Sequence, residues 1–91
     1  MKPLSHFLQT LLTQHGLAEK LQQAQIPELF RQHVGTTVMR RVESVTFHNG
    51  ELLVKASSAL WRIELRMRAE NIRRALNQQL GKETIRIVTI L

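Results

Sequence analysis

The stretch from Ser57 to Gly81 constrains the fold of this chain more than any other part of the sequence. It contains no proline, and its only glycine is its last residue, so nothing interrupts a helix along its length. Ser57 or Ser58 can accept a hydrogen bond from a first-turn N–H, and Gly81 can adopt the left-handed conformation that ends a helix. The stretch therefore predicts one helix roughly 33 Å long, which would cross a small domain.

This predicted helix has distinct faces. An apolar stripe at steps of three and four residues is predicted to lie in the core, and it consists of Trp61, Leu65, Ala69, Ile72, Leu76 and Leu80. A shorter apolar strip that can serve as a protein contact lies away from it and consists of Leu60, Ile63 and Met67. At about 100° per residue, Arg62, Arg66 and Arg73 lie within roughly 40° of one another beside the core stripe. They form either an anion-binding face or a solvated surface in which Glu64 and Glu70 are interleaved.

The part of the chain before the hairpin is predicted to be helical. A first amphipathic helix is expected over residues 1–16, and a helical segment is expected over residues 17–41. Within this segment Pro27 is predicted to end one helix and start the next, because the residue before a proline is pushed out of helical geometry. Gly35 either breaks the second of these helices or lets a neighbouring backbone come close, and we favour the close approach.

Strand patterns lie on both sides of the long helix. Residues 42–56 predict a β-hairpin, because Asn49-Gly50 is a strong signal for a type I′ turn. Residues 83–91 predict a final strand that is rich in β-branched side chains. If the helix returns across the sheet, this strand runs parallel to the second strand of the hairpin. The whole chain then forms a single α+β two-layer domain, with the helix over residues 57–81 packed on a three-stranded sheet.

The positive charge of the chain is concentrated in its second part. The net charge is +6, of which residues 1–35 contribute +1 and residues 36–91 contribute +5. Such a balance favours nucleic acid or another acidic partner, because contacts with phosphates release condensed counterions. The residues expected to meet phosphates are Arg62, Arg66, Arg73, Lys55, Arg40, Arg41 and Arg86. Aromatic side chains for base stacking are few, so binding would be to the backbone and would depend on salt.

The sequence contains no recognisable catalytic or metal-binding pattern. It has no cysteine and no aspartate, its four histidines are not spaced as metal ligands, and its carboxylates are scattered. We therefore expect no enzymatic activity, no cofactor and no metal. No apolar run approaches ~18 residues and no signal-peptide block opens the chain, so we expect a cytoplasmic protein that does not use a membrane.

Several of these positions together resemble the DciA family over about residues 20–91. The family pattern runs from Val-Gly through "Gly-x-Leu-x-Val-x-x-x-Ser", a Trp and Glu-Leu to "Leu-Asn-x-x-Leu-Gly" and a final apolar strand. In this chain the matching residues are Val34-Gly35, Gly50 to Ser58, Trp61, Glu64-Leu65 and Leu76 to Gly81. Phe30 stands where many members have a tryptophan.

The resemblance implies a KH-like α+β fold and a role in bacterial DNA replication. DciA proteins bind the replicative helicase and help to place it on single-stranded DNA, so it implies a nucleoid-associated adaptor rather than an enzyme. The chain would be a short member without the C-terminal tail, and it lacks the Gly-x-x-Gly loop with which KH domains clamp a nucleic-acid backbone. The alternative is a protein–protein interaction module without nucleic-acid binding, with a homodimer as one form, whose contact is the Leu60, Ile63 and Met67 strip or the last strand.

Overall fold

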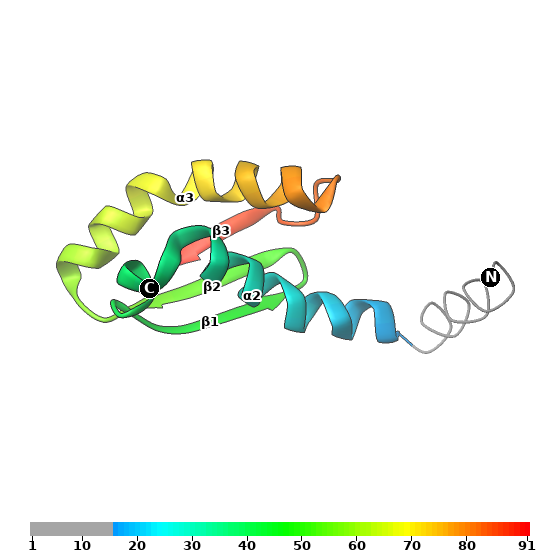
Figure 1. The fold of residues 1–91 in the computed structure, drawn as a ribbon, viewed down its shortest axis with the longest axis horizontal. Helices are drawn as coiled ribbons and strands as arrows, with labels where there is room; N and C mark the ends of the chain where they lie inside the picture. Colours follow the sequence, from blue (N-terminus) through cyan, green and yellow to red (C-terminus); the bar gives the residue numbers. More distant parts are fainter. Residues whose placement is uncertain (1–15) are drawn as a thin grey trace, which may run out of the picture.

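The structure is a computed structural model that describes residues 16–91, so nearly all of the helix expected over residues 1–16 lies outside the described residues. The elements in order are helix α2 (Leu17–Met39), strand β1 (Val42–His48), strand β2 (Glu51–Ala56), helix α3 (Ala59–Leu80) and strand β3 (Ile87–Ile90). The two helices pack on a three-stranded mixed sheet, which confirms the predicted α+β architecture (Figure 1).

Helix α3 has the two end signals that the sequence predicted. The side chain of Ser58 accepts a hydrogen bond from the N–H of Trp61 at 3.3 Å and so caps the first turn. Gly81 has a φ of 77° at the other end, in the left-handed region. The members of the predicted apolar stripe face the core: Leu65, Ile72 and Leu76 are buried, and Trp61, Ala69 and Leu80 pack partly buried beside them.

Strand β2 is the central strand of the sheet. It pairs antiparallel with β1 through the predicted hairpin, whose turn residues Asn49 and Gly50 have φ values of 50° and 81°, as a type I′ turn requires. It pairs parallel with β3, which confirms the predicted direction of the last strand. The covered face of the sheet contributes a row of buried apolar side chains to the core, namely Phe47, Leu52, Val54, Ala56 and Ile90.

Strand β3 is shorter than the run predicted over residues 83–91. Ile85 precedes the strand and is fully buried, whereas Ile87 is 54% exposed, so the two do not share a face as strict alternation would require. The reason is that Ile85 pairs with a side chain instead of with β2. The amide of Asn77 donates to the carbonyl of Ile85 and accepts from its N–H, both at 2.8 Å.

Helix α2 differs from the sequence prediction at both of its helix-breaking residues. Pro27 lies inside the helix, so the prediction that it separates two helices is wrong. Its neighbours Ile26 and Phe30 are fully buried, and this packing stabilises the helix across a residue that removes one backbone donor. Gly35 breaks helical geometry with φ 86° and ψ 171°, and within residues 16–91 no atom beyond its own stretch of chain lies within 4 Å of the place that a Cβ would take. The predicted close approach is therefore wrong, and Gly35 supplies a kink.

Substitution of Gly35 tests the need for this kink. We expect Gly35→Ala to destabilise the domain by about 1–3 kcal/mol despite the open space, because a non-glycine residue is strained at such a positive φ. The thermal unfolding midpoint should fall by several degrees, whereas Thr36→Ala at the exposed next position should leave it nearly unchanged. Equal midpoints for the two variants would show that the chain does not need the glycine conformation.

Candidate nucleic-acid interface

One end of the domain gathers five of the seven residues that the sequence predicted to meet phosphates. At this end, on the left of Figure 1, α2 ends and β1 begins, and β2 leads into the first turn of α3. Hydrogen bonds join these segments: the N–H of Ser57 donates to the carbonyl of Arg41 at 2.9 Å, and the N–H of Ala56 donates to the carbonyl of Leu91 at 2.8 Å. We name this region the basic end. Its five residues are Arg40, Arg41, Lys55, Arg62 and Arg66.

Most of the cations at the basic end are available to an anion. The side chains of Arg40, Arg41 and Arg62 make no hydrogen bond or ion pair with any part of residues 16–91. Lys55 lies 3.5 Å from a carboxylate oxygen of Glu43, and both side chains are more than half exposed. An exposed pair of this kind contributes about 0–1 kcal/mol, so a phosphate can compete with Glu43 for Lys55.

Arg66 combines a structural contact with its place at the basic end. Its Nε and Nη2 groups donate to the carbonyl of Ile90 at 3.3 and 3.1 Å. Ile90 lies on β3, which is an edge strand, and the contact covers one carbonyl group of that edge. The guanidinium is therefore held in a fixed position, and its Nη1 group is not used in this contact.

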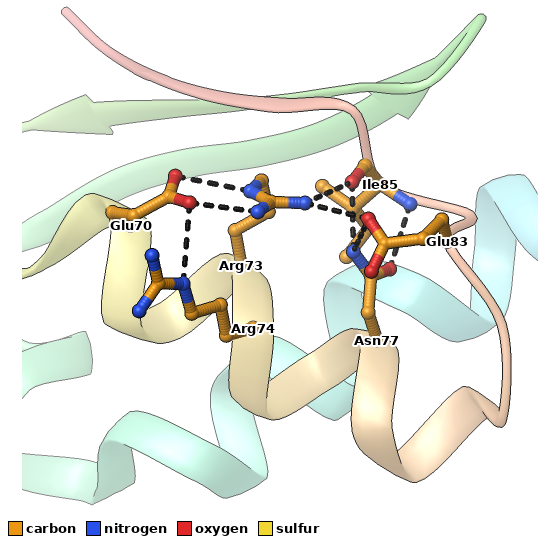
Figure 2. Close-up of polar contacts among 6 residues, drawn as sticks. All are labelled: Glu70, Arg73, Arg74, Asn77, Glu83 and Ile85. Atoms are coloured by element: carbon orange, nitrogen blue, oxygen red, sulfur yellow. Dashed lines mark hydrogen bonds and ion pairs between the residues drawn. The ribbon is translucent and has the colours of Figure 1, made fainter.

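Arg73 and Arg86 are not brought together with the other five residues. The side chain of Arg73 is only 18% exposed, and its guanidinium is held by Glu70 at 2.7 Å and Glu83 at 2.8 Å (Figure 2). The hydrogen bonds to Glu70 and Glu83 raise the pKa of Arg73 above its ordinary value, and the bond to Glu70 has the larger effect. Arg86 donates to the carbonyl of Asn49 at 2.6 Å. Both arginines thus contact their own chain at the end of the domain that carries the hairpin turn.

Asn77 is an important residue that the sequence reasoning missed. It is buried, with 4% of its surface exposed, and its amide holds the backbone of Ile85 where the chain approaches β3 (Figure 2). Helical spacing carried no signal of this role. At about 100° per residue, Asn77 lies within roughly 20° of Arg66, on the arginine side of the helix and away from Trp61. Its burial depends on the segment after α3, whose residue Ile85 supplies the hydrogen-bond partners that a buried amide needs.

The lowered pKa of Glu70 predicts that the folded protein loses stability in acid. The hydrogen bond from Arg73 lowers the pKa of Glu70 below its ordinary 4.5, and the charges of Arg73 and Arg74 act in the same direction. A carboxylate with a lowered folded pKa stabilises above its unfolded pKa, and this contribution is lost as the pH falls through the folded pKa. In thermal unfolding below about pH 4.5, Glu70→Gln should therefore lose less stability than the unmodified protein. A Glu28→Gln control, at a carboxylate 3.7 Å from Arg31, should behave like the unmodified protein, and identical profiles for all three would contradict this role.

A second candidate surface lies on the outer face of α3. Leu60, Ile63 and Met67 are 72%, 58% and 76% exposed, so the short apolar strip of the sequence does face away from the core. Large exposed apolar side chains that lie together on one face can form a contact surface. These three residues are named the α3 strip below.

Neither a metal centre nor a membrane span is found in the described part of the chain. No group of three or more His, Cys, Asp or Glu side chains in residues 16–91 is placed to hold a metal ion. No helix in this range is both long enough and apolar enough to cross a bilayer. The candidate sites are therefore the basic end and the α3 strip.

These features define a small basic α+β domain with binding surfaces as its candidate sites. A protein-family model described as "Dna[CI] antecedent, DciA" matches residues 3–90. The match covers nearly the whole chain, so the chain belongs to the DciA family, as its sequence motifs indicated. Neither the curated proteins nor the solved structures gave a match. The family suggests a helicase-loading role in DNA replication, and it is known for loaders or adaptors rather than enzymes.

Proposed function

We propose that this protein is a non-enzymatic adaptor of the bacterial replicative DNA helicase that binds single-stranded DNA and assists loading of the helicase. Family membership supports the helicase-loading part of this proposal. The DNA-binding part is supported by the basic end, where Arg40, Arg41 and Arg62 have no carboxylate partner within residues 16–91. Such a protein would act in the cytoplasm, in association with the nucleoid.

The binding mode follows from what the basic end contains. Its side chains are cations that recognise phosphates, and they carry no information about base sequence. Phe30 and Phe47 are buried, so neither offers a stacking platform to unpaired bases. We therefore expect binding that depends strongly on salt and little on base sequence. The KH-like comparison stays a prediction, and no step of this mode depends on it.

Fluorescence anisotropy of a labelled single-stranded oligothymidylate tests the DNA-binding part. If four or five phosphates are neutralised, affinity should fall roughly 50- to 130-fold between about 50 and about 200 mM salt. A methylphosphonate oligomer with the same bases and an uncharged backbone is the matched control, and it should not bind. An absence of binding at the lower salt concentration would overturn this part and would leave the helicase contact to be tested by co-sedimentation with the helicase.

The second candidate function is a protein–protein interaction module that does not bind nucleic acid. The exposure of Leu60, Ile63 and Met67 favours it, because the apolar surface of these side chains is removed from water only when a partner binds there. If the partner is a second copy, the mass in solution should rise with protein concentration, and Met67→Glu should abolish that rise. A constant monomeric mass would exclude the homodimer form of this function.

A further inference from the structure

We propose that Glu43 is an internal competitor of DNA at the basic end. Its carboxylate pairs with Lys55 in the free protein, and it is displaced most readily by a phosphate of a DNA strand that the neighbouring arginines already bind. This inference deepens the DNA-binding function proposed above and rests on it. Its structural basis is a β-bulge in β1, which places Glu43 beside Lys55.

The bulge lies at the start of β1. Counted from the hairpin turn, the regular ladder extends to the pair of Ser44 and Lys55. The next residue, Glu43, would then oppose Ala56, which is 4% exposed and belongs to the core. Instead Val42 pairs with Ala56, and Glu43 is the extra residue, without a partner of its own in the register. The bulge thus keeps a carboxylate out of the core and leaves it beside Lys55.

The contact between Glu43 and Lys55 is an exposed ion pair. A carboxylate oxygen lies 3.5 Å from Nζ of Lys55, and the side chains of the lysine and the glutamate are 59% and 51% exposed. Within residues 16–91, no other carboxylate forms an ion pair with a cation of the basic end. Glu43 is therefore the one acidic side chain in this range that occupies a cation of the proposed DNA site.

Exchange of this carboxylate for a phosphate favours a DNA strand over a free anion. A free phosphate must displace Glu43 from Lys55 at whatever concentration it has in solution. A phosphate of a strand that is already bound to Arg41 and Arg62 is held near Lys55, so its local concentration no longer depends on the solution. The displaced carboxylate then lies close to bound phosphates and attracts a cation, which offsets part of the counterion release. Glu43 should therefore weaken DNA binding and make its salt dependence shallower.

The experiment compares Glu43→Gln with the matched variant Glu28→Gln in the full chain. Each substitution removes one negative charge and one exposed ion pair, at 3.5 Å from Lys55 and at 3.7 Å from Arg31 respectively. In anisotropy titrations at about 50 mM salt, Glu43→Gln should bind oligothymidylate roughly fivefold more tightly than the unmodified protein. Its slope of log affinity against log salt should be steeper by about 0.7, the value of one phosphate contact. Glu28→Gln should gain less than about twofold and keep the slope.

A Lys55→Gln background shows whether the carboxylate acts through this lysine. In that background the further substitution Glu43→Gln should improve oligothymidylate binding by less than about twofold, because no lysine is left to be released. A gain that stays near fivefold would mean that Glu43 repels DNA by its charge alone, and it would overturn the competition for Lys55.

Inorganic phosphate tests the preference for a DNA strand. The probe is the side-chain ε-methylene NMR signal of Lys55. In the unmodified protein oligothymidylate should shift this signal, whereas the same concentration of phosphate groups added as inorganic phosphate should not. In Glu43→Gln, inorganic phosphate should shift the signal at a roughly fivefold lower concentration than in the unmodified protein.

Each contrary result overturns a defined part of the inference. Equal affinities of Glu43→Gln and Glu28→Gln for oligothymidylate, or equal responses of Lys55 to phosphate with and without Glu43, would overturn the competition. Equal shifts by oligothymidylate and inorganic phosphate would overturn the preference for a strand. If neither the unmodified protein nor any variant binds oligothymidylate, the proposed DNA-binding function fails, whereas the phosphate titration still decides whether Glu43 competes for Lys55.

Discussion

Replacing Arg41 and Arg62 together with glutamate is expected to weaken binding of single-stranded DNA roughly 100-fold at about 50 mM salt. Both side chains lie at the basic end without a polar partner in residues 16–91, so their replacement removes no hydrogen bond or ion pair within this range. The carbonyl of Arg41, which accepts from Ser57, belongs to the backbone and is retained. The slope of log affinity against log salt should also become shallower by about 1.4, because two phosphate contacts are lost.

The control for this variant carries the same change in net charge at another place. Arg31 and Arg74 are 56% and 71% exposed, and each makes only an exposed ion pair, with Glu28 and Glu70 respectively. The double variant Arg31→Glu and Arg74→Glu should lose only the few-fold affinity that follows from lower net charge. Anisotropy titrations of both variants decide the matter. Equal losses would mean that DNA is attracted by the overall charge and not by the basic end.

Asn77→Ala is expected to have the largest effect on stability, with a loss of about 2–4 kcal/mol. The substitution removes both 2.8 Å hydrogen bonds to Ile85 and leaves its buried N–H without an acceptor. Arg73 still reaches the carbonyl of Ile85, but only at 3.4 Å. Because a domain of this size has limited stability in reserve, the chain between α3 and β3 should loosen and the unfolding midpoint should fall well below that of the unmodified protein.

Urea unfolding measures this loss of stability, and two further variants show whether it comes from the hydrogen bonds of the Asn77 side chain. Gln78→Ala, at the exposed neighbouring position, should cost little, because alanine is a good helix former. Asn77→Asp keeps an acceptor for the N–H of Ile85 but places an oxygen against the carbonyl of Ile85 and close to Glu83. It should therefore destabilise strongly at neutral pH and less in acid. A neutral effect of Asn77→Ala would contradict the role assigned to this side chain.

Much of the fold was predictable from local signals whose physical cause is itself local. The Asn49-Gly50 turn needs two residues that tolerate positive φ, and this sequence supplies them. Ser58 and Gly81 mark the ends of α3 for similarly local reasons, since a side-chain acceptor and a left-handed residue satisfy backbone groups nearby. These signals, with the apolar stripe of α3, were sufficient for the α+β arrangement.

The errors occurred where distant packing overrides local preference. Pro27 disfavours a continuous helix, but Ile26 and Phe30 are fully buried against the rest of the domain and hold the helix together. Gly35 was uncertain for a related reason, because the sequence does not say whether another backbone lies beside it. Only the three-dimensional arrangement distinguishes a close approach from a kink.

The candidate site was predictable in part. Helical spacing places Arg62, Arg66 and Arg73 beside the core stripe of α3, and it groups Arg73 with the other two by angle alone. The carboxylate of Glu83 reaches Arg73 from the segment after α3, and no helical spacing predicts that contact. Likewise, Arg41 lies near the start of α3 because its carbonyl accepts from Ser57, a contact between segments that the sequence does not link.

The most direct test of the basic end is an NMR titration that observes the Nε–H groups of the arginines while an oligothymidylate is added to the full chain. We expect the signals of Arg40, Arg41 and Arg62 to shift in proportion to binding, because their guanidinium groups have no hydrogen-bond or ion-pair partner within residues 16–91. The signal of Arg73 should stay in place, because its side chain is held by Glu70 and Glu83. Shifts confined to Arg73 and Arg86, with the basic end unchanged, would contradict the assignment of the DNA-binding surface.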